Sequence, residues 1–139
     1  MLRKVIPDVV NDQKLVTLSP KATVREAARK MAASNVRSVL VVARGKLEGI
    51  FTGTDLINRV VAPGLDPDTT PLAEVMTVGP EAIPPDSSAI EALRKMQSGR
   101  YRHLPVVEGG KLCGILSRRD FLGFEVEEIE RQDTLWQRM

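Results

Sequence analysis

Two short stretches of this chain hold the residues best suited to bind a small polar ligand. Residues 49–55 (GIFTGTD) and 114–120 (GILSRRD) each place a hydroxyl three positions after a Gly and an Asp six positions after it. Each stretch follows an apolar run and leads into another, which is typical of a strand that ends where a helix begins. A carboxylate there can accept hydrogen bonds from both hydroxyls of a ribose, and free helix N–H groups can hold a phosphate.

The same residues also suit a purely structural role. Ser, Thr and Asp side chains at a helix start accept hydrogen bonds from backbone N–H groups that have no partner within the helix. Taken alone, each stretch is well explained as a helix cap. The repetition of the stretch together with its neighbours favours the binding role.

The two stretches belong to an internal repeat with an offset of 65 residues and no gap. Apolar, charged and turn positions all recur, which indicates one supersecondary unit used twice. The further matches are Pro20 with Pro85, and residues 26–27, 29–31, 41–42 and 45–47 with 91–92, 94–96, 106–107 and 110–112.

Each repeat is predicted to run strand, helix, strand, strand, helix, which gives an α/β (α+β) fold of two pseudo-symmetric halves. Periodicity and turn residues set the bounds. In the first repeat we expect strands at 15–18, 39–42 and 47–51, and helices at 24–34 and 55–61. In the second we expect strands at 81–84, 104–107 and 112–116, a helix at 88–97, and a helix from Asp120 that can continue through 131.

The predicted domains are a first repeat with its lead-in at 1–65, a second repeat at 66–124 and a helical tail at 125–139. The tail is charged and has few apolar positions, so a solvated helix is the simpler interpretation. The alternative is that Val126, Ile129, Leu135 and Trp136 pack on a second copy of the chain.

Composition excludes several classes of site and partner. The net charge of +2 gives no general reason to expect a nucleic acid or a membrane surface as partner. One His and one Cys cannot form a metal cluster or an internal disulfide. No leader or spanning segment is recognised, so we expect a cytoplasmic protein. No motif pairs a nucleophile with a base, so we expect no enzyme and no catalytic residues.

Taken together, these patterns resemble the CBS-domain family, specifically a tandem CBS pair, or Bateman module. The resemblance covers roughly residues 5–124 and rests on the paired Gly-x-x-Thr/Ser-x-x-Asp stretches. The lead-ins at 6–10 and 72–76 and the segments at 16–20 and 103–107 also look typical of the family.

The resemblance implies that the three-stranded sheets of two CBS repeats pack together and leave two clefts, which often bind adenosine nucleotides. It assigns to one cleft Thr17, Ala22, Val36, Arg37, Ile115, Ser117, Arg119 and Asp120. It assigns to the other Ala82, Ser87, Tyr101, Arg102, Ile50, Thr52, Thr54 and Asp55, and His103 beside Arg102 is a further donor to phosphate.

The two clefts are not equivalent. Ala82 takes the position of Thr17, so one cleft loses a hydroxyl, and Tyr101 takes the position of Val36 and could stack on a base. We expect a purine ligand with Asp55, Thr54, Tyr101 and Arg102, and the Asp120 cleft is the close second. The alternative for Arg102 and His103 is a structural role, in which they line a sheet edge and bind no ligand.

The function implied is a regulatory module that senses adenosine nucleotides such as AMP, ADP or ATP and signals to an unknown effector protein. No other cofactor is expected. The alternatives are a structural homodimerisation module with degenerate clefts, or a binder of S-adenosylmethionine or NADH. A homodimer is expected from apolar helix surface at Leu56, Ile57, Val60, Val61, Phe121, Leu122 and Phe124.

Overall fold

The structure is a computed structural model that describes residues 2–138, apart from the side chains of Asp133 and of residues 136–138. Its mixed α/β elements form two compact units. The first-repeat unit contains Lys14–Pro80 together with Gly110–Leu112. The second-repeat unit contains the N-terminal residues up to Gln13, Glu81–Gly109 and the chain from Cys113 onward.

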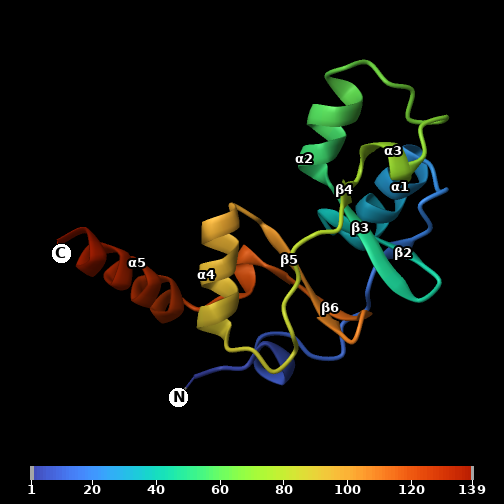
Figure 1. Cartoon of the computed structure of the whole chain (residues 1–139). Coiled ribbons are helices and arrows are strands. Elements are labelled where there is room, and N and C mark those ends of the chain that lie inside the picture. Colours follow the sequence, from blue (N-terminus) through green and yellow to red (C-terminus); the bar gives the residue numbers. More distant parts are fainter. Residues whose placement is uncertain (1, 139) are drawn as a thin grey trace. The chain divides into compact units, whose positions relative to one another are not determined.

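The first-repeat unit is built on a four-stranded sheet in the order β1-β2-β3-β4 (Figure 1). Strand β1 pairs parallel with β2, and the other neighbours are antiparallel. The elements in chain order are β1 (Thr17–Leu18), α1 (Val24–Ser34), β2 (Ser38–Ala43), β3 (Lys46–Thr52), α2 (Gly53–Asp55), the π-helical turns η2 (Leu56–Val61), α3 (Leu72–Val75) and β4 (Thr77–Val78).

Helix α1 forms as its sequence predicts. Thr23 caps it by accepting a hydrogen bond from the Glu26 N–H, at 3.2 Å. Val24, Ala27 and Met31 recur at helical spacing and are buried. They pack in one core with strand residues that include Phe51.

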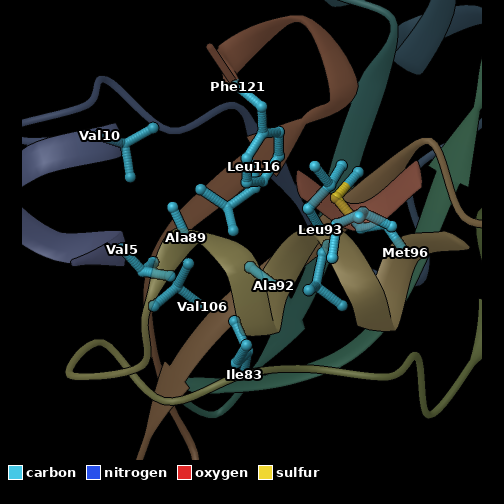
Figure 2. Close-up of a cluster of buried hydrophobic side chains, with 12 residues drawn as sticks. Val5, Val10, Ile83, Ala89, Ala92, Leu93, Met96, Val106, Leu116 and Phe121 are labelled. Carbon is cyan, nitrogen blue, oxygen red and sulfur yellow. The ribbon is translucent and has the colours of Figure 1, made fainter. Parts of the chain in front are cut away.

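The second-repeat unit has a hairpin sheet of β5 and β6. Its elements are the π-helical turn η1 (Val5–Val9), α4 (Ala89–Gly99), β5 (His103–Glu108), β6 (Lys111–Ser117), the 3-10 turn η3 (Arg118–Asp120) and α5 (Gly123–Arg138). Figure 2 shows its core, in which Leu93 and Met96 of α4 lie among apolar side chains from the strands.

The two lead-ins are exchanged between the repeats. Val5 and Val10, which precede the first repeat, are part of the core of the second-repeat unit (Figure 2). Leu72 and Val75, which precede the second repeat, are part of the core of the first-repeat unit. Folding units and sequence repeats therefore do not coincide, and the bounds 1–65 and 66–124 stay a division of the sequence.

Equivalent hydrogen bonds hold the two exchanged segments. The Val5 N–H donates to the Ser87 carbonyl at 2.8 Å, and the Leu72 N–H donates to the Ala22 carbonyl, also at 2.8 Å. Ala22 and Ser87 are matched positions of the repeat. Each repeat thus offers the same docking position to the lead-in of the other.

The strand expected at 81–84 is reduced to a single parallel bridge between Ile83 and Val106. In the first repeat, the Leu40 N–H donates to the Val16 carbonyl at 3.0 Å and extends the pairing of β1. The matched residue is Pro105, which has no N–H to donate. The loss of this one donor explains why the second copy of the strand is shorter.

The second helix of each repeat also differs from the prediction. The helix expected at 55–61 begins at Gly53, in α2, and continues into η2. The helix expected from Asp120 is interrupted, because Phe121 is extended and its side chain packs in the core. A new helix then starts, and the Glu125 carboxylate accepts a hydrogen bond from the Leu122 N–H at 2.8 Å.

Candidate functional site

Asp55 closes the first of the two matched turns. Its Oδ2 accepts a hydrogen bond from the Thr52 N–H at 2.9 Å, and Thr52 Oγ1 accepts one from the Asp55 N–H at 3.2 Å. This reciprocal pair is a capping box. The other carboxylate oxygen, Oδ1, lies 3.6 Å from Arg59 Nε. Asp55 therefore does act as a helix cap, as the sequence allowed, and the cap uses only one of its two carboxylate oxygens.

Asp120 closes the second turn in the same way. Its Oδ2 accepts a hydrogen bond from the Ser117 N–H at 2.6 Å. Asp120 is half-buried, whereas Asp55 is buried. In both turns the cap uses Oδ2 and leaves Oδ1 outside the cap, so capping and ligand binding are compatible at one carboxylate.

Basic residues stand beside Asp120 at the start of β5 and in the turn after β6. The Arg118 N–H donates to the Arg102 carbonyl at 3.3 Å, which joins the start of β5 to the turn after β6. Burial, and next the positive charge of Arg119, lower the pKa of the His103 imidazole, while the charge of Asp120 opposes them. His103 is thus mainly neutral at pH 7, and the guanidinium groups supply the positive charge of this edge.

The matched edge of the first-repeat unit has the same backbone and less charge. The Gly53 N–H donates to the Arg37 carbonyl at 3.0 Å, as Arg118 does to Arg102. Thr54 stands where the second repeat has Arg119, and Ser38 stands where it has His103. The two edges therefore share a backbone hydrogen bond, and the edge beside Asp120 has the more basic residues.

The Gly that begins each stretch makes room for an exchanged segment. A Cβ on Gly49 would lie 2.5 Å from Met76 Sδ and 2.9 Å from the Thr77 carbonyl oxygen. A Cβ on Gly114 would lie 2.9 Å from Gln13 Oε1. The Gln13 amide accepts from the Ile115 N–H at 2.8 Å and donates to the Ile115 carbonyl at 2.9 Å.

The side chain of Gln13 therefore takes the place, in the second-repeat unit, that strand β4 has in the first-repeat unit. In the first-repeat unit, Ile50 pairs with Thr77 of β4. In the second-repeat unit the matched Ile115 pairs instead with the side-chain amide of Gln13, which carries the same donor and acceptor as a peptide group.

The backbone carbonyls of Thr17 and Ala82 have matched lysine partners. Lys30 Nζ donates to the Thr17 carbonyl at 3.2 Å, and Lys95 Nζ donates to the Ala82 carbonyl at 3.0 Å. Both interactions place an ammonium group beside a residue predicted to line a cleft. In the sequence, the signal for these two lysines is the repeated Arg-Lys-Met triplet at 29–31 and 94–96.

Tyr101 is half-buried, and its ring lies over the C-terminal end of α4, because a Cβ on Gly99 would come within 2.7 Å of three ring atoms. Val36, its counterpart, is also half-buried and packs against the first-repeat core. The proposed stacking of Tyr101 on a base stays a prediction.

The structure divides the predicted site residues between the two units. The first-repeat unit holds Thr17, Ala22, Val36, Arg37, Ile50, Thr52, Thr54 and Asp55, and the second-repeat unit holds Ala82, Ser87, Tyr101, Arg102, His103, Ile115, Ser117, Arg119 and Asp120. Each predicted cleft draws on both units, so the composition of the clefts stays a prediction.

Two arginines near the caps had no signal in the repeat pattern. Arg59 approaches Asp55 and also donates to the carbonyls of Val75 and Met76, at 3.3 and 3.0 Å. Arg3 donates to the Asp120 carbonyl at 3.2 Å and to the Glu125 carboxylate at 2.7 Å. The residues at the offset of 65 from them are Phe124 and Asp68, so each arginine occurs in one repeat alone.

Comparison with known proteins decides the family. The sequence model of the CBS domain matches residues 6–62 and again residues 72–127. The chain belongs to the CBS-domain family. Its fold is that of a tandem CBS pair, and CBS pairs are regulatory modules.

Relatives of this CBS pair include proteins of very different length. It is 41% identical over 119 residues to the CBS domain-containing protein CBSCBSPB2 of Arabidopsis thaliana, which covers 85% of this chain and 22% of that protein. The chain thus spans about a fifth of the length of these plant relatives. It is 35% identical over 115 residues to the CBS domain-containing protein YhcV of Bacillus subtilis, which covers 83% of this chain and 81% of that protein.

A solved CBS structure matches the whole pair. The CBS domain protein PAE2072 from Pyrobaculum aerophilum, complexed with AMP, superimposes with a TM-score of 0.80 at 27% identity and covers 93% of this chain and 98% of that one. In the described part of this CBS pair, no helix is long and apolar enough to cross a membrane. Within the same residues, no three His, Cys, Asp or Glu side chains are grouped to hold a metal ion.

Proposed function

We propose that this chain is a regulatory module of the cytoplasm that binds an adenosine nucleotide and signals its presence to a partner protein. The observation that carries the proposal is the pair of matched capping boxes, in which each Asp keeps one carboxylate oxygen outside the cap. That oxygen can accept hydrogen bonds from ribose hydroxyls while the turn remains closed. The AMP complex of PAE2072 supports the choice of ligand class.

The proposal includes the two composite clefts implied by the family. In the favoured one, Asp55 and Thr54 bind the ribose and phosphate, and Tyr101 and Arg102 cover the base and add charge. In the second, Asp120 is the ribose acceptor. The basic edge beside Asp120 supports this second cleft, because Arg118 and Arg119 stand where the matched edge has the uncharged Gly53 and Thr54.

Calorimetric titration tests the ligand and the site together. AMP, ADP, ATP, S-adenosylmethionine and NADH are titrated into the wild type and into Asp55→Ala and Asp120→Ala. A hydrogen bond to a charged group contributes about 1.5–3 kcal/mol, so the variant of an occupied cleft is expected to bind an adenosine nucleotide roughly ten- to hundred-fold more weakly.

The 2′-deoxy nucleotide separates ribose recognition from capping. It is expected to bind the wild type more weakly than the parent nucleotide, and to show little further loss with the Asp variant of the same cleft. If both Asp→Ala variants bind as tightly as the wild type, the two carboxylates serve only as caps and the proposal fails. Tight binding of NADH or S-adenosylmethionine alone would change the ligand class.

A structural homodimerisation module is the second candidate, because both Asp residues do act as caps. Of the predicted contact residues, Val60 and Phe121 pack in the cores of their own units. Ile57 and Val61, one turn apart on η2, are 62% and 66% exposed and remain suited to an interface. Light scattering across the micromolar range tests the homodimer, and a monomer throughout would exclude it.

The proposed module has no catalytic turnover. No sequence motif pairs a nucleophile with a base, and Oδ2 of Asp55 and of Asp120 accepts a hydrogen bond within its own turn. Incubation with ATP is expected to leave it intact. Stoichiometric release of AMP or phosphate that disappears in Asp55→Ala or Asp120→Ala would overturn this.

A further inference from the structure

The end of β6 is held by one side chain at the place where the matched strand β3 is held by β4. The Gln13 amide accepts a hydrogen bond from the Ile115 N–H at 2.8 Å and donates one to the Ile115 carbonyl at 2.9 Å. In the first-repeat unit the main chain does this, because Gly49 and Ile50 pair with β4. Main-chain pairing is open to most residue types, whereas the contact in the second-repeat unit depends on the identity of one residue.

The backbone at Asp12 explains why a side chain takes the place of a strand here. Asp12 and Gln13 match Thr77 and Val78 of β4 at the offset of 65. Asp12 has a φ of 50°, in the left-handed region, so the backbone at this residue is not extended and does not run along β6 as a strand. Asp is one of the few residue types that adopt this conformation readily. The next side chain, Gln13, then supplies the donor and the acceptor that a strand would have supplied.

The strand that Gln13 holds leads directly into the Asp120 turn. Ser117, two residues after Ile115, donates its N–H to Asp120 Oδ2 at 2.6 Å. Arg118 donates its N–H to the Arg102 carbonyl at 3.3 Å. A shift of Ile115 is therefore transmitted through a short stretch of strand to the carboxylate that is proposed to bind ribose.

Beyond the turn, the chain is fixed by apolar packing. Phe121 and Ile129 are buried in the core of the second-repeat unit, and Val126 packs against that core. The alternative that Val126 and Ile129 face a second copy is therefore wrong, and Trp136, named with them, lies outside the described side chains. Apolar packing is shared among many atoms, so the Gln13 contact is the support of the turn that one polar substitution alters most easily.

Gln13 also lies where the chain leaves the second-repeat unit. Lys14 is the first residue of the first-repeat unit, and Thr17 follows three residues after it. The family resemblance assigns Thr17 to the same cleft as Ile115 and Asp120. Holding Gln13 on Ile115 therefore fixes the start of the four-residue segment that leads to Thr17, which spans at most about 14 Å.

We propose that Gln13 is a positioning residue for the Asp120 turn and thereby for nucleotide binding at that turn. Its amide holds the end of β6 so that Asp120 keeps its place while Oδ2 closes the cap. The inference rests on the proposed function and adds a residue that lies outside the repeated Gly-x-x-Thr/Ser-x-x-Asp stretches. The Asp55 turn follows a strand paired with β4 and does not depend on Gln13.

Titration of AMP into the full chain tests Gln13 in two backgrounds that separate the two turns. Gln13→Met keeps the length of the side chain and removes both its donor and its acceptor. In the chain that carries Asp55→Ala, where binding depends on Asp120, Gln13→Met is expected to weaken AMP binding roughly three- to ten-fold, as loss of a hydrogen bond of ordinary strength predicts. In the chain that carries Asp120→Ala it is expected to leave AMP binding unchanged.

Gln13→Glu makes the contact depend on pH, which a merely structural role would not transmit to AMP binding. An ionised carboxylate accepts from the Ile115 N–H but repels the Ile115 carbonyl, whereas a protonated carboxyl has a donor and an acceptor, as the amide has. Compared with Gln13 in the same Asp55→Ala chain at the same pH, AMP binding is expected to be weak at about pH 7.5. It is expected to recover toward about pH 4.5, near the ordinary Glu pKa of about 4.3.

Asn11→Met is the matched control, because it exchanges an amide for a thioether at an exposed residue of the same lead-in. It is expected to leave AMP binding unchanged in both backgrounds. Gly114→Ala disturbs the contact from the other side, because its Cβ would lie 2.9 Å from Gln13 Oε1. It is expected to act in the same direction as Gln13→Met.

Amide NMR signals give a measurement that needs no ligand. Gln13→Met is expected to speed hydrogen exchange at the Ile115 N–H and to shift the amide signals of Ser117 and Asp120. Gln13→Glu is expected to shift the same signals at about pH 7.5 and to return them toward the wild-type positions at about pH 4.5.

Three results would overturn the proposal. Unchanged AMP binding in the Asp55→Ala chain, with faster exchange at Ile115, would make Gln13 a residue that only closes a strand edge. An equal loss in both backgrounds would make it a general stabiliser of the fold. If the Asp55→Ala chain binds no AMP, the proposed function fails at Asp120 for that nucleotide. Unshifted Ser117 and Asp120 signals in Gln13→Met would then exclude the positioning role as well, whereas shifted signals would uphold it.

Discussion

At the scale of single residues, the site is organised around carboxylates with two tasks. Asp55 and Asp120 each commit one oxygen to a cap and keep the other outside it. The neighbours differ, since Arg59 forms an ion pair with Asp55, whereas the charges of Asp120, Arg102 and Arg119 all act on His103. The two turns have the same capping hydrogen bond and differ in the charged residues near the carboxylate.

His103 gives a prediction for pH, because burial and Arg119 lower the pKa of its imidazole in the folded state. The unfolded chain then binds more protons near pH 6, so the free energy of unfolding falls as pH is lowered through the ordinary His pKa of about 6.5. The stabilisation is complete above that pH and is lost as pH falls through the folded pKa.

Proton NMR measures this directly, because His103 is the one histidine of the chain. Its imidazole signals are expected to titrate with a midpoint below that of a denatured sample. His103→Gln is expected to flatten the stability profile between about pH 7.5 and 5.5, a range chosen to bracket the ordinary His value of about 6.5. A midpoint at or above the denatured value would contradict the prediction.

Replacement of Gly by Ala is expected to destabilise the fold by different amounts at Gly49 and at Gly114. Gly49→Ala would press Cβ against the Thr77 backbone, which cannot rotate away, and should destabilise by about 1–3 kcal/mol. Gly114→Ala meets a side chain, Gln13, and should cost less, about 0.5–1.5 kcal/mol for a weakened hydrogen bond. Urea unfolding measures both.

Gly53→Ala is the matched control, because a Cβ there meets no atom within 4 Å. It is expected to be neutral or slightly stabilising. Equal losses at Gly49, Gly114 and Gly53 would show that close approach of the exchanged segments is not what these glycines provide.

Residue types at fixed offsets were enough to locate Asp55, Asp120 and their hydroxyl partners as turn residues. They were not enough for Arg3, Arg59 or Gln13. Repeat matching finds residues that occur twice, whereas each of these three makes its contact in one unit alone. Matching the two repeats therefore does not predict contacts that occur in only one of them.

At the scale of elements, the lead-in of the first repeat is fastened to α5 by a buried ion pair. Arg3 Nη2 lies 2.7 Å from Glu125 Oε1, and the Glu125 side chain is 1% exposed. Burial raises the pKa of Glu125, but the bonds from Arg3 and from the Leu122 N–H outweigh it and lower the pKa overall. The pair therefore stabilises the fold above the ordinary Glu pKa and loses its effect as pH falls below it.

Arg3→Met is expected to be strongly destabilising, by about 3–5 kcal/mol, because it leaves a buried carboxylate without its partner. Adding Glu125→Gln should recover most of the loss, because Gln keeps a cap acceptor for the Leu122 N–H and carries no charge. Urea unfolding of the single and double variants forms the cycle. Additive losses would show that Arg3 and Glu125 do not act as a pair.

Element order was predictable, and element ends were less so. The helix at 24–34 and the hairpin strands follow from periodicity and turn residues. The single bridge at Ile83 follows from one missing N–H at Pro105, and the break at Phe121 follows from burial of its ring. Both depend on contacts with residues distant in sequence, which local patterns do not contain.

At the scale of the whole chain, folding units and repeats are offset. The first-repeat core includes Leu72 and Val75, beyond the end of the first repeat, and the second-repeat core includes Val5 and Val10. The family and the tandem arrangement could be predicted, because matched motifs recur at one offset. The exchange of the two lead-ins could not be predicted, because both are apolar and either repeat could bury either one.

Fragments test this offset. Residues 14–80 contain every core residue of the first-repeat unit and are expected to fold alone, with dispersed amide signals in NMR. Residues 1–65 lack Leu72 and Val75 and are expected to be much less ordered, since each lost apolar side chain costs about 2–5 kcal/mol. Equal order in both fragments would show that the exchanged lead-in is dispensable.

The exchange also sets an order of events during synthesis. Every residue of the first-repeat core is outside the ribosome once Met76 has left it. Val5 and Val10 leave far earlier, yet their partners extend to Ile129. Since domains fold as units while translation proceeds, the nascent chain is expected to carry a folded middle while its N-terminal segment still waits for a core. For that interval Val5 and Val10 are exposed apolar residues, available to chaperones or to the wrong partner.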